Sequence, residues 1–320
     1  MRARQFLILI PAVVMLPFSA FPKSAPCSTQ RVLVTVVEEK GNPVLGLQKT
    51  NFRAKLRHKP LKILSAEPWT GQRRAVLLFD VSGSMTAWIP LEKEVGLTIV
   101  RQAPPGASFA ADLFARRTEA RVPFTTSSAA VVKEVSALDR IARSIPRKGR
   151  RTAIFEAISA GTSMFGEARP GDIICVITDG IGVRWTREGQ LERTLLAKGI
   201  HLYAFLLITL GGQPGVGFPA ASGRGGIEDL TAISGGRTYA LETGLYPYRA
   251  TLSKRLRDDI QYLSRMFDSQ LQRAYMIKVR LPIHLKKPES WRLEVVDQHG
   301  KANHHMSVFY PHLSPCPTAP

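Results

Sequence analysis

Oxygen-bearing side chains cluster at the end of one apolar run near the middle of the chain. Residues 75–85 read AVLLFDVSGSM, in which Asp80, Ser82 and Ser84 follow the run at alternate positions. Such a run is typical of a strand that is buried on both faces of a parallel sheet. Gly83 allows a tight turn between the two serines. Carboxylate and hydroxyl oxygens are hard donors, which suit Mg²⁺, Mn²⁺ or Ca²⁺ and do not suit a metal held by thiolates.

Two later segments favour a metal site over an ordinary helix cap, in which Ser84 would only bond the first free amides of the next helix. IICVITDG, residues 173–180, is a second apolar strand, and it ends at Asp179. RTAIFEAI, residues 151–158, places Thr152 at the start of a helix with an apolar period. The predicted ligands therefore lie on three loops: Asp80, Ser82, Ser84, Thr152 and Asp179.

At these three segments the chain resembles a von Willebrand factor type A domain. The D-x-S-x-S run, the threonine of T-A-x-x-x-A-I and the aspartate of T-D-G match that family's metal-ion-dependent adhesion site residue by residue. The resemblance implies a divalent cation, Mg²⁺ first, with Mn²⁺ and Ca²⁺ as alternatives. It also implies a Rossmann-like fold. Glu156 departs from the Asp that many relatives carry, but this position is not a ligand in the family pattern.

The surrounding elements are expected to bring the three loops to one edge of a sheet. Over residues 73–246, predicted strands alternate with predicted helices. The strands are expected at 75–79, 107–115, 120–124, 173–178, 201–208 and 237–241, and the helices at 86–103, 128–144, 152–158, 187–198 and 226–234. This alternation predicts an α/β fold, a doubly wound and mostly parallel sheet with helices on both faces. Ligands bind beyond the carboxyl ends of such strands, where Asp80 and Asp179 lie.

The two ends of the chain are predicted to build a small β-sandwich-like domain together. Residues 28–72 contribute its first part and residues 272–312 its last strands, while residues 247–271 form a connecting amphipathic helix and 313–320 a tail. RVLVTVVEE is rich in β-branched residues, which favours a strand over a helix. The pattern V-x-x-x-x-G-x-P-V-x-G-L-x-x-x-x-F resembles, more loosely, the segment that precedes the A domain in secreted bacterial VWFA-related proteins.

Residues 1–25 are interpreted as a secretory signal peptide. Two arginines precede an apolar run, and small residues follow it. We therefore expect an exported protein, periplasmic or extracellular, with no transmembrane span after signal removal. A retained N-terminal anchor is the alternative. Export would allow Cys27 and Cys316, at the two ends of the small domain, to form a disulfide, although the proline-rich tail argues against it. Cys175, in mid-strand, is predicted to be a buried thiol.

The formal net charge of the 320 residues is +19, which would suggest nucleic acid in a cytosolic protein. The predicted signal and the lack of an aromatic-interleaved recognition motif argue against that partner, so we expect no nucleic acid. An anionic envelope surface or an acidic protein is the better expectation. The densest basic run comes directly before Thr152 and is predicted to lie at the rim of the metal site: Arg147, Lys148, Arg150 and Arg151. A solvated loop is the alternative.

Neither a nucleophile–base arrangement nor a nucleotide fingerprint emerges, so the chain is not expected to be an enzyme. As the family's adhesion mode implies, the first hypothesis is a protein-binding or adhesion module that captures an Asp or Glu of a partner through the cation. The second is a structural or assembly subunit of an envelope complex in which the metal mainly stabilises the fold. A metal-dependent hydrolase is the weaker third alternative.

Overall fold

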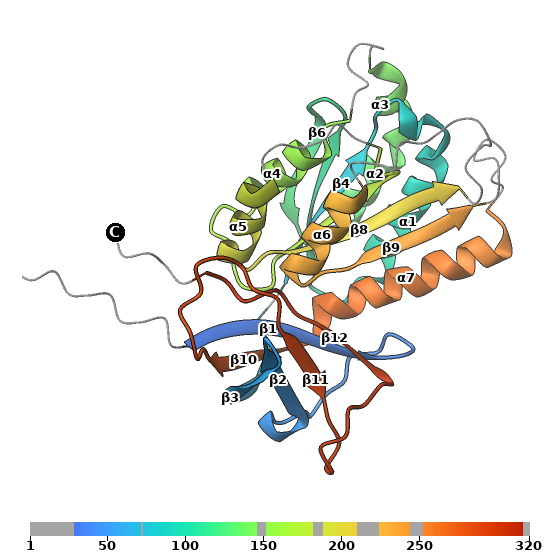
Figure 1. The fold of residues 1–320 in the computed structure, drawn as a ribbon. Helices are drawn as coiled ribbons and strands as arrows, with labels where there is room; N and C mark the ends of the chain where they lie inside the picture. The colour runs from blue at the N-terminus through green and yellow to red at the C-terminus, as the bar shows by residue number, and fades with distance from the viewer. Residues whose placement is uncertain are drawn as a thin grey trace, which may run out of the picture.

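The computed structural model describes residues 29–71, 73–145, 152–181, 188–209, 224–243 and 252–315. These residues fold around two six-stranded sheets (Figure 1). The larger sheet has the order β6-β5-β4-β7-β8-β9. Its strands are β4 (Arg74–Asp80), β5 (Ser108–Phe114), β6 (Thr118–Thr125), β7 (Ile173–Thr178), β8 (His201–Thr209) and β9 (Thr238–Thr243). All neighbours in it are parallel except β5 and β6, so the predicted mostly parallel sheet is confirmed.

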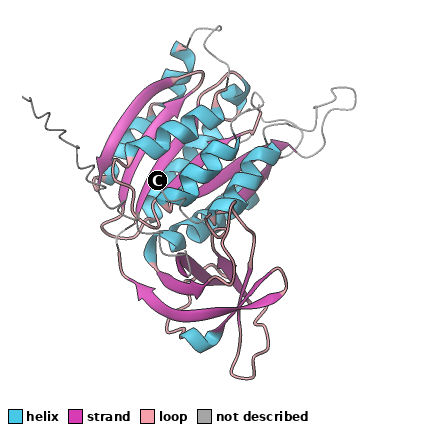
Figure 2. Ribbon diagram, turned by 60° about the vertical axis from the view of Figure 1, so that its left-hand side comes forward, coloured by secondary structure: helices cyan, strands magenta, loops and turns pink. Residues whose placement is uncertain are grey.

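Helices cover both faces of this sheet, and alternate residues of the strands face each layer. One face packs under α1 (Ile89–Gln102), α2 (Ser128–Ser136), α3 (Leu138–Ser144) and α7 (Lys254–Gln272). The other packs under α4 (Ile154–Met164), α5 (Glu188–Lys198) and α6 (Arg224–Ser234). On β4, for example, Leu77 and Phe79 contact the first layer, and Val76 and Leu78 contact the second. The predicted doubly wound α/β class is confirmed (Figure 2).

Two of the predicted helices differ from the structure. Residues 128–144 form α2 and α3, because the chain turns at Ala137 and directs the fully buried Leu138 into the core. The predicted helix from residue 86 begins as a 3-10 turn, η2 (Ser84–Ala87), and α1 starts only at Ile89. Pro90 lies in the first turn of α1. Proline has no amide hydrogen, so it suits a helix start but not the interior of the longer helix that was predicted.

The smaller sheet uses both ends of the chain, as predicted, and has the order β11-β2-β3-β10-β1-β12. Its strands are β1 (Thr29–Glu38), β2 (Phe52–Leu56), β3 (Lys59–Trp69), β10 (Ala274–Arg280), β11 (Arg292–Val295) and β12 (Met306–Phe309), with a short 3-10 helix, η1 (Lys49–Asn51), before β2. All pairings are antiparallel. The inward side chains pack into one core of their own, so the sheet curls around its contents like a barrel that is nearly closed.

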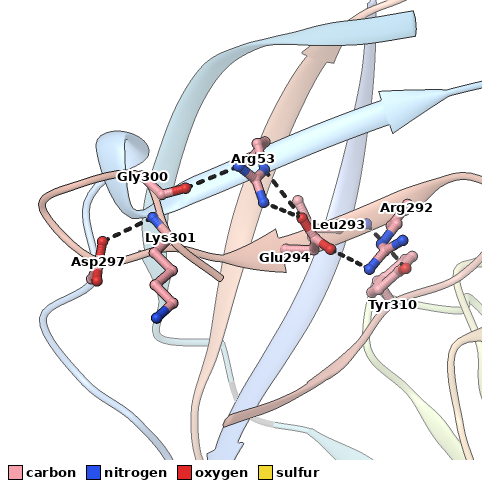
Figure 3. Close-up of polar contacts among 8 residues, drawn as sticks. All are labelled: Arg53, Arg292, Leu293, Glu294, Asp297, Gly300, Lys301 and Tyr310. Carbon is pink, nitrogen blue, oxygen red and sulfur yellow. Dashed lines mark hydrogen bonds and ion pairs between the residues drawn. The ribbon is translucent and has the colours of Figure 1, made fainter. Parts of the chain in front are cut away.

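Side chains close the seam between the two edge strands of this sheet, β11 and β12 (Figure 3). The Tyr310 hydroxyl accepts a hydrogen bond from the Leu293 amide at 3.0 Å and donates one to the Trp291 carbonyl at 3.2 Å. On the opposite side of β11, Arg53 of β2 donates to the Glu294 carboxylate of β11 at 2.8 Å and to the Gly300 carbonyl, in the loop between β11 and β12, at 2.9 Å. Tyr310 thus meets part of the hydrogen-bonding need of an unpaired strand edge.

The two sheets are tied together by Arg73, which lies in the link between β3 and β4. Its guanidinium donates to the Gln270 carbonyl near the end of α7 and to the Thr35 hydroxyl of β1 at 3.2 Å. Helix α7 then leads into β10 of the small sheet. Cys175 on β7 is a buried free thiol, as predicted. The predicted partners Cys27 and Cys316 lie outside the described residues.

Candidate metal centre

The first predicted loop folds tightly around the end of β4. Ala75–Phe79 are buried between the two helix layers, and the strand ends with the buried Asp80 at the edge of the sheet. The Ser82 amide donates to Asp80 Oδ1 at 3.0 Å, and the hydroxyls of Ser82 and Ser84 lie 3.2 Å apart. Asp80 and Ser82 are buried while Ser84 is exposed. The carboxylate therefore lies at the bottom of the loop and a hydroxyl at its mouth.

The second loop reaches the same place because β7 is the parallel neighbour of β4. Thr178 Oγ1 donates to Asp80 Oδ2 at 2.6 Å, which joins the two strand ends directly. Asp179 is buried, and its Oδ1 accepts the Ile181 amide at 2.9 Å. Gly180 has φ of 72°, a left-handed conformation that glycine adopts without strain, and it turns the chain after Asp179. The structure thus brings together Asp80, Ser82, Ser84 and Asp179.

Thr152 lies at the same edge of the sheet but is not joined to the other four residues. The amide of its neighbour Ala153 bonds the Ala115 carbonyl at 3.0 Å, just beyond the β5 residue that pairs with Asp80. Within the part of the chain that the structure describes, no hydrogen bond links the Thr152 side chain to the other four predicted ligands. The predicted rim residues Arg147, Lys148, Arg150 and Arg151 lie outside the described ranges.

A third carboxylate, which the motif does not contain, lies against this loop. Glu92 in the first turn of α1 is fully buried, and its Oε1 accepts the Asp80 amide at 2.7 Å. In the sequence it stands among lysine and glutamate in an amphipathic helix, a context that normally indicates a solvent-facing residue. Pro90 marks the start of the helix, but no sequence signal shows that Glu92 faces β4, because this depends on the contact of Gly96 with Phe79.

Burial and mutual repulsion disfavour negative charge on these carboxyl groups. Burial, and then the neighbouring Asp179, raise the pKa of Asp80 to about 7, although hydrogen bonds from Thr178 and Ser82 oppose this. Burial, then Asp80 and Asp179, raise the pKa of Glu92 well above its usual range. Neither Asp80 nor Glu92 makes an ion pair with a described residue. Such groups become stable as carboxylates only beside a positive charge.

The donor set fits a hard divalent cation. Carboxylates and hydroxyls converge at the carboxyl ends of β4 and β7, the edge where open α/β sheets bind ligands. Among the described residues no group of three or more His, Cys, Asp and Glu side chains has a metal-binding arrangement. The candidate centre instead combines carboxylates with hydroxyls, the oxygen donors that Mg²⁺, Mn²⁺ and Ca²⁺ prefer.

Two neighbouring sequence features do not contribute to this site. Trp88, eight residues after Asp80, packs in the core beside α1. His304 and His305 form an exposed turn before β12, where His305 pairs with Glu39 at 2.9 Å.

Comparison with known proteins adds a likeness of overall fold. No family model and no curated protein matches the sequence. A von Willebrand factor type A protein from Catenulispora acidiphila is 11% identical over 91% of this chain and 73% of that chain, with a TM-score of 0.44. The conserved hypothetical protein BatB from Bacteroides thetaiotaomicron is 19% identical over 61% and 98%, with a TM-score of 0.42. Manganese-loaded TRAP protein from Plasmodium vivax is 13% identical over 80% and 100%, with a TM-score of 0.43.

At these identities and scores, the solved structures carry no argument about ligand or activity. The assignment of a metal centre therefore depends on this chain's own residues. No helix in the described ranges has the length and apolar character needed to cross a membrane.

Proposed function

We propose that this chain is an exported binding protein that captures an acidic side chain of a protein partner through a divalent cation, Mg²⁺ first. The residues that would hold the cation, directly or through water, are Asp80, Ser82, Ser84, Thr152 and Asp179. The observation that supports the proposal most is the bonding of Thr178 to Asp80, which fixes one predicted ligand beside the next strand's Asp179 in a buried position.

Each part of the loop has a separate task in this proposal. Asp80 and Asp179 supply negative charge at the bottom of the site, where burial strengthens its attraction for a cation. Ser84 is exposed at the mouth, so a group arriving from solvent meets the site there. When bound, the cation supplies an open position for an oxygen ligand. The exposed Ile181, beside Asp179, adds an apolar contact surface at the same mouth.

The test selects peptides on the immobilised protein in Mg²⁺ from a random library and elutes them with chelator. The proposal expects enriched peptides that contain Asp or Glu, that lose binding when this residue becomes Asn or Gln, and that do not bind Asp80→Ala. Peptides that bind equally in chelator, or equally to Asp80→Ala, would refute capture through the cation.

The full burial of Asp80 favours one second candidate, in which the cation only stabilises the fold of an assembly subunit. That function predicts a lower melting temperature in chelator, with no peptide binding that depends on Mg²⁺. The same selection, accompanied by thermal denaturation, therefore separates the two candidates.

A further inference from the structure

Glu92 has an environment that its hydrogen bond alone does not explain. Its carboxyl group is fully buried, one oxygen accepts the Asp80 amide at 2.7 Å, and the other has no hydrogen-bond partner among the described residues. A glutamine would accept the same amide and would bury an uncharged group, which costs much less than burying a carboxylate. The hydrogen bond to Asp80 therefore does not explain why this buried position holds a residue that can carry a negative charge.

The start of helix α1 holds Glu92 firmly against the end of β4. The Trp88 carbonyl accepts the amides of both Leu91 and Glu92 at 2.9 Å, which sets the first turn. One turn later, Gly96 lies so close to β4 that a Cβ there would be 2.5 Å from the Phe79 ring. Residues four apart lie on the same helix face, so this close approach also presses Glu92 toward Asp80.

Glu92 also lies close to the proposed ligands, since its Oε1 accepts the Asp80 amide and Asp80 is bonded to Thr178, the residue before Asp179. No described cation forms an ion pair with Glu92 or Asp80. Negative charge on Asp80 and negative charge on Glu92 therefore repel each other in the buried site, and a bound cation would favour the carboxylate form of both.

We propose that Glu92 is a positioning residue of the metal centre: one oxygen holds the main chain of Asp80 in place, and the carboxylate adds negative charge for the cation. The inference rests on the proposed function, since it requires a cation at Asp80. It extends the site beyond the five motif residues to a residue on helix α1. The charge of Glu92 favours a divalent cation and disfavours the empty site, so replacing it affects the two states in opposite directions.

The test is Glu92→Gln, which keeps the size and one hydrogen-bond acceptor, removes the charge and places an amide NH₂ where the second oxygen was. Glu94→Gln, two residues along the same helix and less buried, is the matched control. Affinity for Mn²⁺ is measured by electron paramagnetic resonance, and melting temperature is measured in chelator. We expect Glu92→Gln to bind Mn²⁺ about 10–100-fold more weakly, the usual effect of removing an outer partner of a metal ligand. Its melting temperature in chelator should equal or exceed that of the wild type, and Glu94→Gln should match the wild type in both measurements.

Equal Mn²⁺ affinity of Glu92→Gln and wild type would overturn this inference while leaving the proposed function standing. A lower melting temperature in chelator with weaker Mn²⁺ binding would show a purely structural role and would also overturn it.

If Glu92→Gln does not fold, the same measurements are made on Glu92→Asp, which keeps the charge. Affinity within about tenfold of wild type supports the role, and a loss as complete as in Asp80→Asn overturns it. A wild type that binds no Mn²⁺ refutes the proposed function together with this inference.

Discussion

Asp268 makes the stability of this protein depend on pH in an unusual direction. It lies on the face of α7 that packs against the sheet, it is 3% exposed, and neither carboxyl oxygen has a hydrogen-bond partner among the described residues. Burial raises its pKa from 3.8 to about 8. The titratable group that it affects is the Cys175 thiol, whose own pKa is raised well above its usual range by burial and by Asp268, so this thiol stays neutral.

The sign follows from proton linkage. Because the folded protein binds the Asp268 proton more tightly than the unfolded chain does, this stabilising effect is complete below the unfolded pKa and disappears as pH rises through the folded pKa. Asp268→Asn cannot ionise and so avoids this loss. Between pH 5 and pH 8, at about 1.4 kcal/mol for each pH unit, the stability of the variant relative to wild type should rise by on the order of 4 kcal/mol.

The assay is urea unfolding of wild type and Asp268→Asn at pH 5, 7 and 9, in chelator so that metal binding does not contribute. Asp258→Asn, an exposed position on the same helix, is the control and should follow the wild type at every pH. Parallel pH profiles for wild type and Asp268→Asn would refute the conclusion that Asp268 is buried without a partner for its charge.

Three further predictions concern packing, the seam and the chain ends. Gly96→Ala should destabilise the protein by about 1–3 kcal/mol through contact with Phe79 and should weaken Mn²⁺ binding, as calorimetry would show; unchanged values would contradict the close approach of α1. Tyr310→Phe, which removes both seam hydrogen bonds, should cost about 1–3 kcal/mol in urea unfolding, and a neutral result would show that the seam does not need them. A bridge between Cys27 and Cys316 in exported protein would make both resist alkylation until reduced, and ready alkylation of both without reductant would exclude the bridge.

The parts of the site that lie on buried strands were predictable from the sequence. Asp80 and Asp179 each end an apolar run, and parallel strands bring such ends to one edge, so their place at the same edge follows from the pattern. That β4 and β7 are direct neighbours is known only from the structure. Glu92 was missed because the rotation and closeness of α1 depend on Gly96 meeting Phe79, a contact between two elements that neither sequence pattern contains. The link from Thr178 to Asp80 was missed for the same reason.

The fold outside the large sheet was less predictable. Strand β3 was not predicted because Pro60 and Pro68 interrupt its pattern, and proline is rare within paired strands. It forms because β2 and β10 pair with it on both sides, which is a long-range effect. The break at Ala137 was missed because the apolar period continues through it. Local pattern thus indicates which residues are buried but not which partners bury them.

The central claim, a cation at Asp80 with a position that an acidic residue can fill, is tested most directly by the relaxation rate of water protons in Mn²⁺ solution. Addition of wild-type protein is predicted to enhance relaxation by Mn²⁺, because bound Mn²⁺ keeps exchangeable water. Saturation with a selected Asp- or Glu-containing peptide is predicted to reduce this enhancement, because its carboxylate replaces water. Asp80→Ala should give neither effect. No enhancement with the wild type, or an enhancement that is equal in Asp80→Ala, would contradict the account.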